Sequence, residues 1–176
     1  MNELDVRYPI GRFDFKAAFR SEDRPLFLGQ LAEAPTKLNA AIAGLSDQHL
    51  DTAYRPEGWT VRQVVHHLAD AQVNWYIRAK LAVTESQPRT VPYAEQLWAE
   101  LPDARLGPIE PSLKMFEGVT ERWCRLLESL RPQDWSRDFT NAEWGTLTVE
   151  DTLRGMAWHT RHHTAHITEL RKRMNW

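Results

Sequence analysis

The stretch from Trp158 to Leu170, WHTRHHTAHITEL, holds four of the seven histidines of the chain: His159, His162, His163 and His166. Apolar residues recur around this stretch every three or four positions, which predicts an amphipathic helix from a capping Thr148 to about Met174. On a helical wheel, His159 and His163 lie on the apolar side of this helix. His166 lies at the boundary of that side, and His162 is expected to face solvent.

A second helix that bears histidine is predicted from Val61 to about Glu85. Thr60 has the position of its N-cap, and Gln63 completes a capping-box pattern. The segment before this helix, LSDQHLDTAYRPEGWTV, weakly resembles LRPQDWSRDFTNAEWGTLTV, which precedes the last helix. His67 follows its capping threonine by seven positions, and His159 and His163 follow theirs by eleven and fifteen. Because these spacings differ by four, the three histidines should occupy about the same face of their helices.

The rest of the chain predicts two more helices and long connections. Residues 1–20 are expected to form an extended arm that lies on the body of the protein. Residues 21–45 have a helical pattern that Pro35 should kink or split, and a third helix fits residues 111–130. The other segments are a loop at 46–58, an irregular Pro-rich connection at 88–108 with a short helix around 93–101, and a hairpin or loop at 135–148. The predicted fold is therefore all-α, a four-helix bundle that forms one domain over residues 1–176.

The composition is that of an ordinary globular protein. Hydrophobic residues make up 42% and charged residues 26% of the 176 residues, and the net charge is −2. Such a balanced charge does not indicate a partner that is a nucleic acid or a membrane. The N-terminus does not have the pattern of a signal peptide, and no apolar run is long enough to span a bilayer. Cys124 is the one cysteine of the sequence, so an intrachain disulfide is not expected. A cytoplasmic location is expected.

The spacing of the histidines predicts a metal site. Histidines at positions i and i+4 of a helix can bind one ion, and a third histidine from a neighbouring helix completes a three-imidazole set. Such a set leaves coordination positions open, as catalytic sites do. A single inward histidine is more often a residue of the hydrophobic core than a metal ligand, and an i,i+4 pair of histidines often lies on the solvated surface. The third histidine at a matching position favours a metal site over both of these alternatives.

Four motifs identify the chain as a member of a known family: YPIGRF, LDTAYRPEGWTVRQVVHHLAD, YIRAKL and WHTRHHTAHITELRKRMNW. Together they resemble the YfiT branch of the DinB-like superfamily. The resemblance implies a four-helix bundle with zinc or nickel on three histidines, and a homodimer. It places the metal on His67, His159 and His163, the three that the helical wheel selects. Relatives often have a small or polar residue at the position of Arg161, which the wheel places outside the site.

The resemblance leaves more than one reaction open. Members of the branch are described as metal-dependent hydrolases, and related proteins as S-transferases for low-molecular-weight thiols such as bacillithiol or as thiol-dependent isomerases. The metalloprotease motif HExxH has a glutamate beside its first histidine, but Thr160 stands at that position here. A hydrolase would need another base, with Asp70, Glu169 or His166 as candidates. A thiol loses its proton on binding the metal, so transfer of a small-molecule thiol to an electrophile is the preferred prediction. The alternatives are a hydrolase that uses a metal-bound water and a non-catalytic bundle.

Further residues are candidates for the pocket around such a metal. Asn74 and Arg78 follow His67 by seven and eleven positions and could bind carboxylates or hydroxyls of a thiol, although Arg78 could equally pair with an acidic side chain. Asp70 could orient a ligand imidazole or be a solvated charge. Trp59 and Trp158 flank the histidine helices and could form walls of the pocket.

Overall fold

A computed structural model describes residues 5–176 and has the predicted architecture. Its helices are α1 (Arg24–Ala32), α2 (Ala34–Ile42), α3 (Asp47–Leu50), α4 (Val61–Thr84), α5 (Glu95–Trp98), α6 (Pro102–Leu106), α7 (Glu110–Glu128) and α8 (Val149–Met174), with 3₁₀ turns η1 (Ser21–Asp23) and η2 (Pro132–Ser136). Its strands are β1 (Arg89–Thr90), β2 (Asp138–Asn141) and β3 (Gly145–Thr148).

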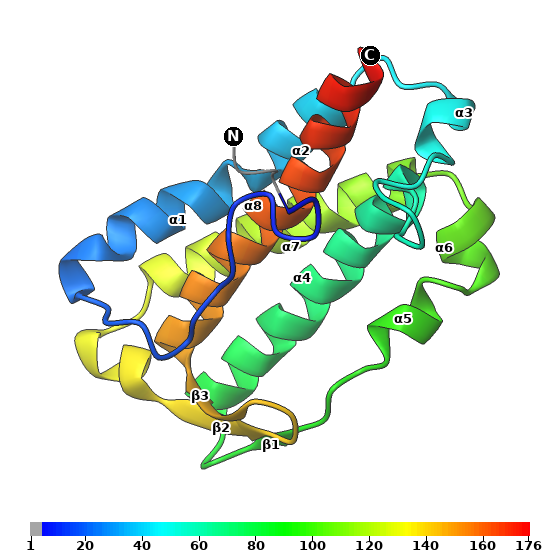
Figure 1. The fold of residues 1–176 in the computed structure, drawn as a ribbon. Helices are drawn as coiled ribbons and strands as arrows, with labels where there is room; N and C mark the ends of the chain where they lie inside the picture. Colours follow the sequence, from blue (N-terminus) through cyan, green and yellow to red (C-terminus); the bar gives the residue numbers. More distant parts are fainter. Residues whose placement is uncertain (1–4) are drawn as a thin grey trace.

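Four long helical segments form a bundle (Figure 1). Helix α8 packs against α4 on one side and against α1 and α2 on the other, and α7 also packs against α4, α1 and α2. The buried residues form two clusters. One contains Trp123, Phe139 and Leu153, and the other contains Leu38, Phe116 and Ile167. The prediction of a four-helix bundle is confirmed.

The first helical segment is divided at Glu33, close to the predicted position. Pro35 lies in the first turn of α2, where a backbone N–H has no partner within the helix and its loss is tolerated. Helix α1 ends at Ala32. Pro35 therefore splits the predicted helix in two.

Capping boxes begin the two helices that carry histidines. The Thr60 hydroxyl accepts a hydrogen bond from the backbone N–H of Gln63, and the Gln63 side chain accepts one from the N–H of Thr60. Thr148 and Asp151 repeat this arrangement at α8. Both helix starts agree with the sequence prediction, so the register of the histidines is set locally.

The connections contain structure that the sequence did not predict. The expected loop at 46–58 includes the short helix α3, which Ser46 caps. Strand β1 pairs in parallel with β2, and β2 and β3 form the antiparallel hairpin that was one of two expectations for this segment. A strand of two residues, like β1, is too short to leave a periodic pattern.

The N-terminal part of the described chain, residues 5–20, has no helix or strand and runs across the face of α8 (Figure 1). It matches the predicted extended arm, while residues 1–4 lie outside the described part. Across residues 5–176, none of the helices has both the length and the hydropathy that crossing a bilayer requires.

Candidate metal centre

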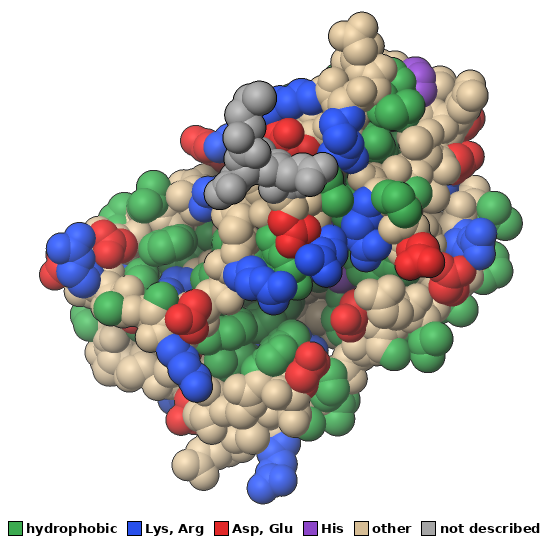
Figure 2. All heavy atoms as spheres, viewed as in Figure 1, with side chains coloured by type: hydrophobic (Ala, Val, Ile, Leu, Met, Phe, Trp, Pro, Cys, Tyr) green, Lys and Arg blue, Asp and Glu red, His purple; other side chains and the backbone are tan. Residues whose placement is uncertain are grey.

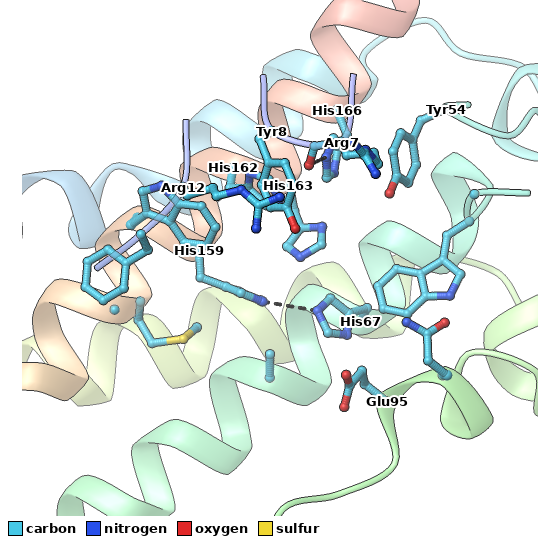
Figure 3. Close-up of a pocket in the computed structure, with 18 of the residues that line it drawn as sticks. Arg7, Tyr8, Arg12, Tyr54, His67, Glu95, His159, His162, His163 and His166 are labelled. Atoms are coloured by element: carbon cyan, nitrogen blue, oxygen red, sulfur yellow. Dashed lines mark hydrogen bonds between the residues drawn. The ribbon is translucent and has the colours of Figure 1, made fainter. Parts of the chain in front are cut away.

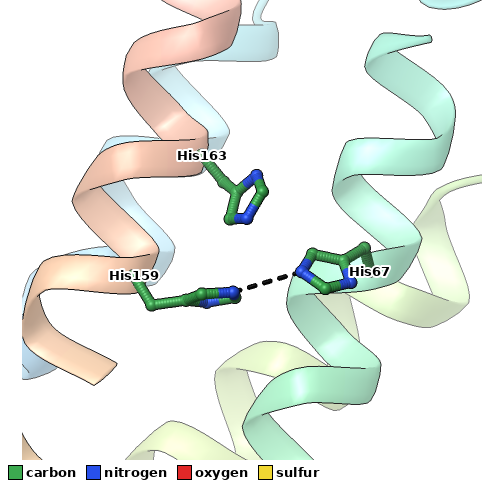
Figure 4. Close-up of side chains that lie close together, drawn as sticks. All are labelled: His67, His159 and His163. Atoms are coloured by element: carbon green, nitrogen blue, oxygen red, sulfur yellow. Dashed lines mark hydrogen bonds between the residues drawn. The ribbon is translucent and has the colours of Figure 1, made fainter. Parts of the chain in front are cut away.

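Three histidines from two helices of the bundle meet in one place (Figure 4). His67 projects from α4, and His159 and His163 project from successive turns of α8. One ring nitrogen of each lies within 4.8 Å of those of the other two. The Nε2 atoms of His67 and His159 are 3.1 Å apart. This is the cluster that the helical wheel selected.

Burial keeps these imidazoles neutral. Burial, with smaller contributions from the neighbouring His162 and His166, lowers the pKa of His67 to about 3. The pKa values of His159 and His163 fall well below the usual value, mainly through burial and then through the other histidines of the cluster. A neutral imidazole has a free nitrogen lone pair, which is the form that binds a metal.

The donor set fits a divalent ion of the zinc or nickel type. These ions prefer imidazole nitrogen, and three such ligands leave room for further ones. The buried Nδ1 atoms of His159 and His163 have no hydrogen-bond partner within residues 5–176. Buried polar atoms without partners are costly, so converging imidazoles with unsatisfied nitrogens are consistent with a site built for a ligand.

A cavity of about 640 Å³ opens over the three histidines. Figure 3 shows their rings among the side chains that line it, with the arm residues Arg7, Tyr8 and Arg12 above them in this view. On the molecular surface, hydrophobic side chains gather in a hollow at the centre of this face, with charged side chains around its rim (Figure 2). The volume is that of a small-molecule site.

The prediction that His162 faces solvent is wrong. His162 is 6% exposed, stacks on Trp158 and packs against Tyr8 of the arm. His166, expected at a boundary, is also buried; it stacks on Tyr54, and its Nε2 lies 3.2 Å from the carbonyl oxygen of Arg7. A helical wheel describes one helix, whereas here the arm covers the side of α8 that would otherwise meet solvent.

Several predicted site residues lie outside the cavity lining. The Asp70 carboxyl does not line the cavity and makes no hydrogen bond to a histidine within residues 5–176, while Glu169 pairs with Lys172 on the surface. Asn74 donates to the carbonyl of Asp70 on its own helix. Buried Arg78 donates to the carbonyl of Val91 and does not pair with an acidic side chain of the described chain. None of these four residues lines the cavity.

Other predictions about position agree with the structure. Trp59, Trp158 and His166 line the cavity, and Trp59 packs against His67 at a ring distance of 4.5 Å. Arg161 is exposed, lies outside this cavity and donates to Gln30.

Sequence reasoning missed most of the cavity lining. Most of the missed residues come from the arm, the loop before α4, the α5 region and the hairpin: Arg7, Tyr8, Arg12, Phe13, Phe15, Tyr54, Arg55, Glu57, Gly58, Tyr93, Glu95, Gln96 and Trp144. The others lie on α4 and α8: Ala71, Trp75, Gly155, Met156 and His162. Helical periodicity cannot identify residues of irregular segments. The YPIGRF and LDTAYRPEGW motifs contain several of these residues, so the family motifs were the one feature of the sequence that could have indicated them.

Known proteins match this chain over almost its whole length. Proteins named "Putative metal-dependent hydrolase" from Bacillus cereus and Bacillus thuringiensis are 48% identical over 172 residues, which cover 98% of this chain and 99% of theirs. The solved structure of Bacillus subtilis YfiT, described as a "probable metal-dependent hydrolase with an unusual four-helix bundle topology", superposes with a TM-score of 0.93. It is 42% identical, and the match covers 97% of this chain and 98% of that one. The model of the DinB superfamily matches residues 30–167. The chain is a YfiT-like member of the DinB superfamily.

Proposed function

We propose that this protein is a metal-dependent hydrolase in which His67, His159 and His163 hold one divalent ion. The observation that carries the proposal is the convergence of three neutral imidazoles, two buried and that of His159 partly buried, within 4.8 Å in the lining of a cavity. The names of the relatives support it. Zinc and nickel both suit the donors.

A divalent ion held there would polarise the substrate and lower the pKa of water at its open positions. In hydrolysis, the oxygen of water bonds to the acyl carbon, the bond to the leaving group breaks, and the leaving group takes a proton. Within the described chain, the carboxylates that line the cavity are Glu57 and Glu95, and Figure 3 shows Glu95 on the same side as His67. Glu95 therefore replaces Asp70 and Glu169 as the candidate proton acceptor.

Metal content tests the site. We expect about one divalent ion per chain in protein purified without a tag, and its loss in His67→Ala and His163→Ala. The matched control is His66→Gln, because His66 is equally buried but contacts Ser112 on α7 instead of the cluster. No ion in the wild-type protein after incubation with zinc or nickel, or retention in both alanine variants, would reject the proposal.

Thiol transfer is a second candidate because of the charges in the cavity. Arg7, Arg12 and Arg55 line it and could bind the carboxylates of a small thiol. In this reaction the sulfur bonds to the carbon of the electrophile, the bond to the leaving group breaks, and the thiol proton is lost to solvent. A divalent ion held by the three histidines would favour the thiolate form, so this reaction would not require a protein base.

Glu95→Gln separates the two reactions. Hydrolysis predicts turnover of a nitrophenyl ester without thiol and a rate loss of roughly 10²-fold in Glu95→Gln. Thiol transfer predicts that turnover requires an added carboxylate-bearing thiol such as cysteine, and that Glu95→Gln leaves the rate almost unchanged. Gln96→Ala, next to Glu95 and also in the lining, is the control for local disturbance.

A further inference from the structure

The cavity continues from the histidines along α4 and α8 toward the hairpin. The two helices run antiparallel (Figure 1), so a step forward on α4 and a step backward on α8 lead the same way. One turn from His67 is Ala71, and one turn from His159 is Gly155. Both line the cavity. The lining beside the cluster is therefore formed by residues with little or no side chain.

An aromatic wall closes this end of the cavity. Trp75, one turn beyond Ala71, stacks on Trp144 of the hairpin with ring centroids 5.0 Å apart and an angle of 12° between the planes. Phe15 of the arm stacks on Trp75 at 6.3 Å. Phe15 also lies over Gly155, where an added Cβ would be 3.3 Å from its ring. Gly155 thus allows the arm to approach α8 closely and to complete the wall.

Charged lining residues come from other segments. They are supplied by the arm before Phe13, by residues 55–57 and by α5: Arg7, Arg12, Arg55, Glu57 and Glu95. The lining from α4, α8 and the hairpin at this end is Ala71, Trp75, Trp144, Gly155 and Met156. The guanidinium of Arg78 is near Trp75 and Trp144 but outside the lining, and donates to Val91. Among the described residues, those that α4, α8 and the hairpin contribute to the lining at this end are therefore apolar or aromatic, and they favour a flat apolar group.

We infer that the cavity binds substrates with a planar apolar group, such as an aryl ring, seated against Phe15, Trp75 and Trp144 beside the histidine cluster. The inference rests on the proposed function for the reacting end of the substrate. It assigns the substrate class as aryl-bearing compounds whose ring lies beside Ala71 and Gly155, about one helical turn, roughly 5 Å, from the histidine cluster. The charged residues that line the rest of the cavity can then bind the polar part of the substrate.

The test follows indole N–H signals by NMR during titration with 2-naphthalenemethanol, a neutral planar probe. Metal-free protein is used so that the metal contributes nothing to the result. We expect saturable shifts of the Trp75 and Trp144 signals and a stationary Trp98 signal. Trp144→Ala should weaken binding roughly three- to tenfold, as loss of aromatic contact predicts. Trp98→Ala is the matched control: Trp98 is 40% exposed and Trp144 39%, but Trp98 does not line the cavity.

Three results would overturn the inference: no saturable shift of the Trp75 signal, equal loss of affinity in both variants, or unchanged or tighter binding in Trp144→Ala. The outcome is independent of the metal measurement. If the protein binds the probe at Trp75 but no metal, the aromatic subsite is supported and the proposed function is rejected. If it binds metal but not the probe, the aromatic subsite is rejected and the proposed metal site is supported.

Discussion

Asp70 has a half-buried carboxyl on α4, three residues after His67. Burial raises its pKa to about 6, and the negative charge of Asp103 contributes. The unfolded chain releases this proton near pH 4, whereas the folded protein retains it until about pH 6. The unfolded state thus binds fewer protons over this interval, and the free energy of unfolding falls as pH rises from 4 past 6.

Asp70→Asn should therefore stabilise the metal-free protein at pH 8. The full shift would correspond to roughly 3 kcal/mol, but partial solvent exposure reduces the expected gain to about 1 kcal/mol. Urea unfolding at pH 8 and at pH 4 measures it, and the gain should vanish at pH 4, where the carboxyl is protonated. A loss of stability at pH 8 would show that the ionised carboxylate has a partner. A loss of metal would show that it orients a ligand histidine.

At the scale of one element, the start of α8 fixes the register of two histidines of the cluster. The Thr148 hydroxyl accepts from the backbone N–H of Asp151, while Asp151 accepts from the N–H and hydroxyl of Thr148. His159 and His163 follow on the same helix and lie well inside it. The cap contributes to stability at the helix end, where backbone N–H groups have no partner within the helix.

Thr148→Ala should lower the free energy of unfolding by about 1 kcal/mol and leave the metal stoichiometry unchanged. Thr148→Ser retains a hydroxyl and should recover most of the loss. Denaturant unfolding of both variants, together with metal content, checks the prediction. If Thr148→Ala and Thr148→Ser lower the free energy of unfolding equally, the loss comes from packing of the threonine methyl group, and the cap makes no contribution.

At the scale of the whole molecule, the metal should stabilise the fold because its donors come from two helices. An ion that binds the folded state but not the unfolded one adds about 2.7 kcal/mol when its free concentration is 100 times the dissociation constant. Zinc or nickel should therefore raise the melting temperature, and a chelator should reverse the change. The same titration of His163→Ala should show almost no increase. An equal increase in that variant would place the stabilising ion elsewhere.

Much of the fold is determined locally and could be predicted from the sequence. The capping threonines, the break at Pro35 and the apolar periodicity define the long helices. The same periodicity places His67, His159 and His163 on inward faces, because a regular helix fixes the direction of each side chain relative to its neighbours. The sequence thus determined four long helical segments and the three histidines that converge between two of them.

The tertiary structure decided what surrounds that cluster. His162 is buried because the arm lies over it, and Trp144 meets Trp75 because the hairpin folds back to the end of α4. These contacts join segments distant in sequence, and their residues belong to irregular stretches without a period. The cavity, its arginines and its aromatic wall therefore depend on packing between segments, which local patterns do not encode.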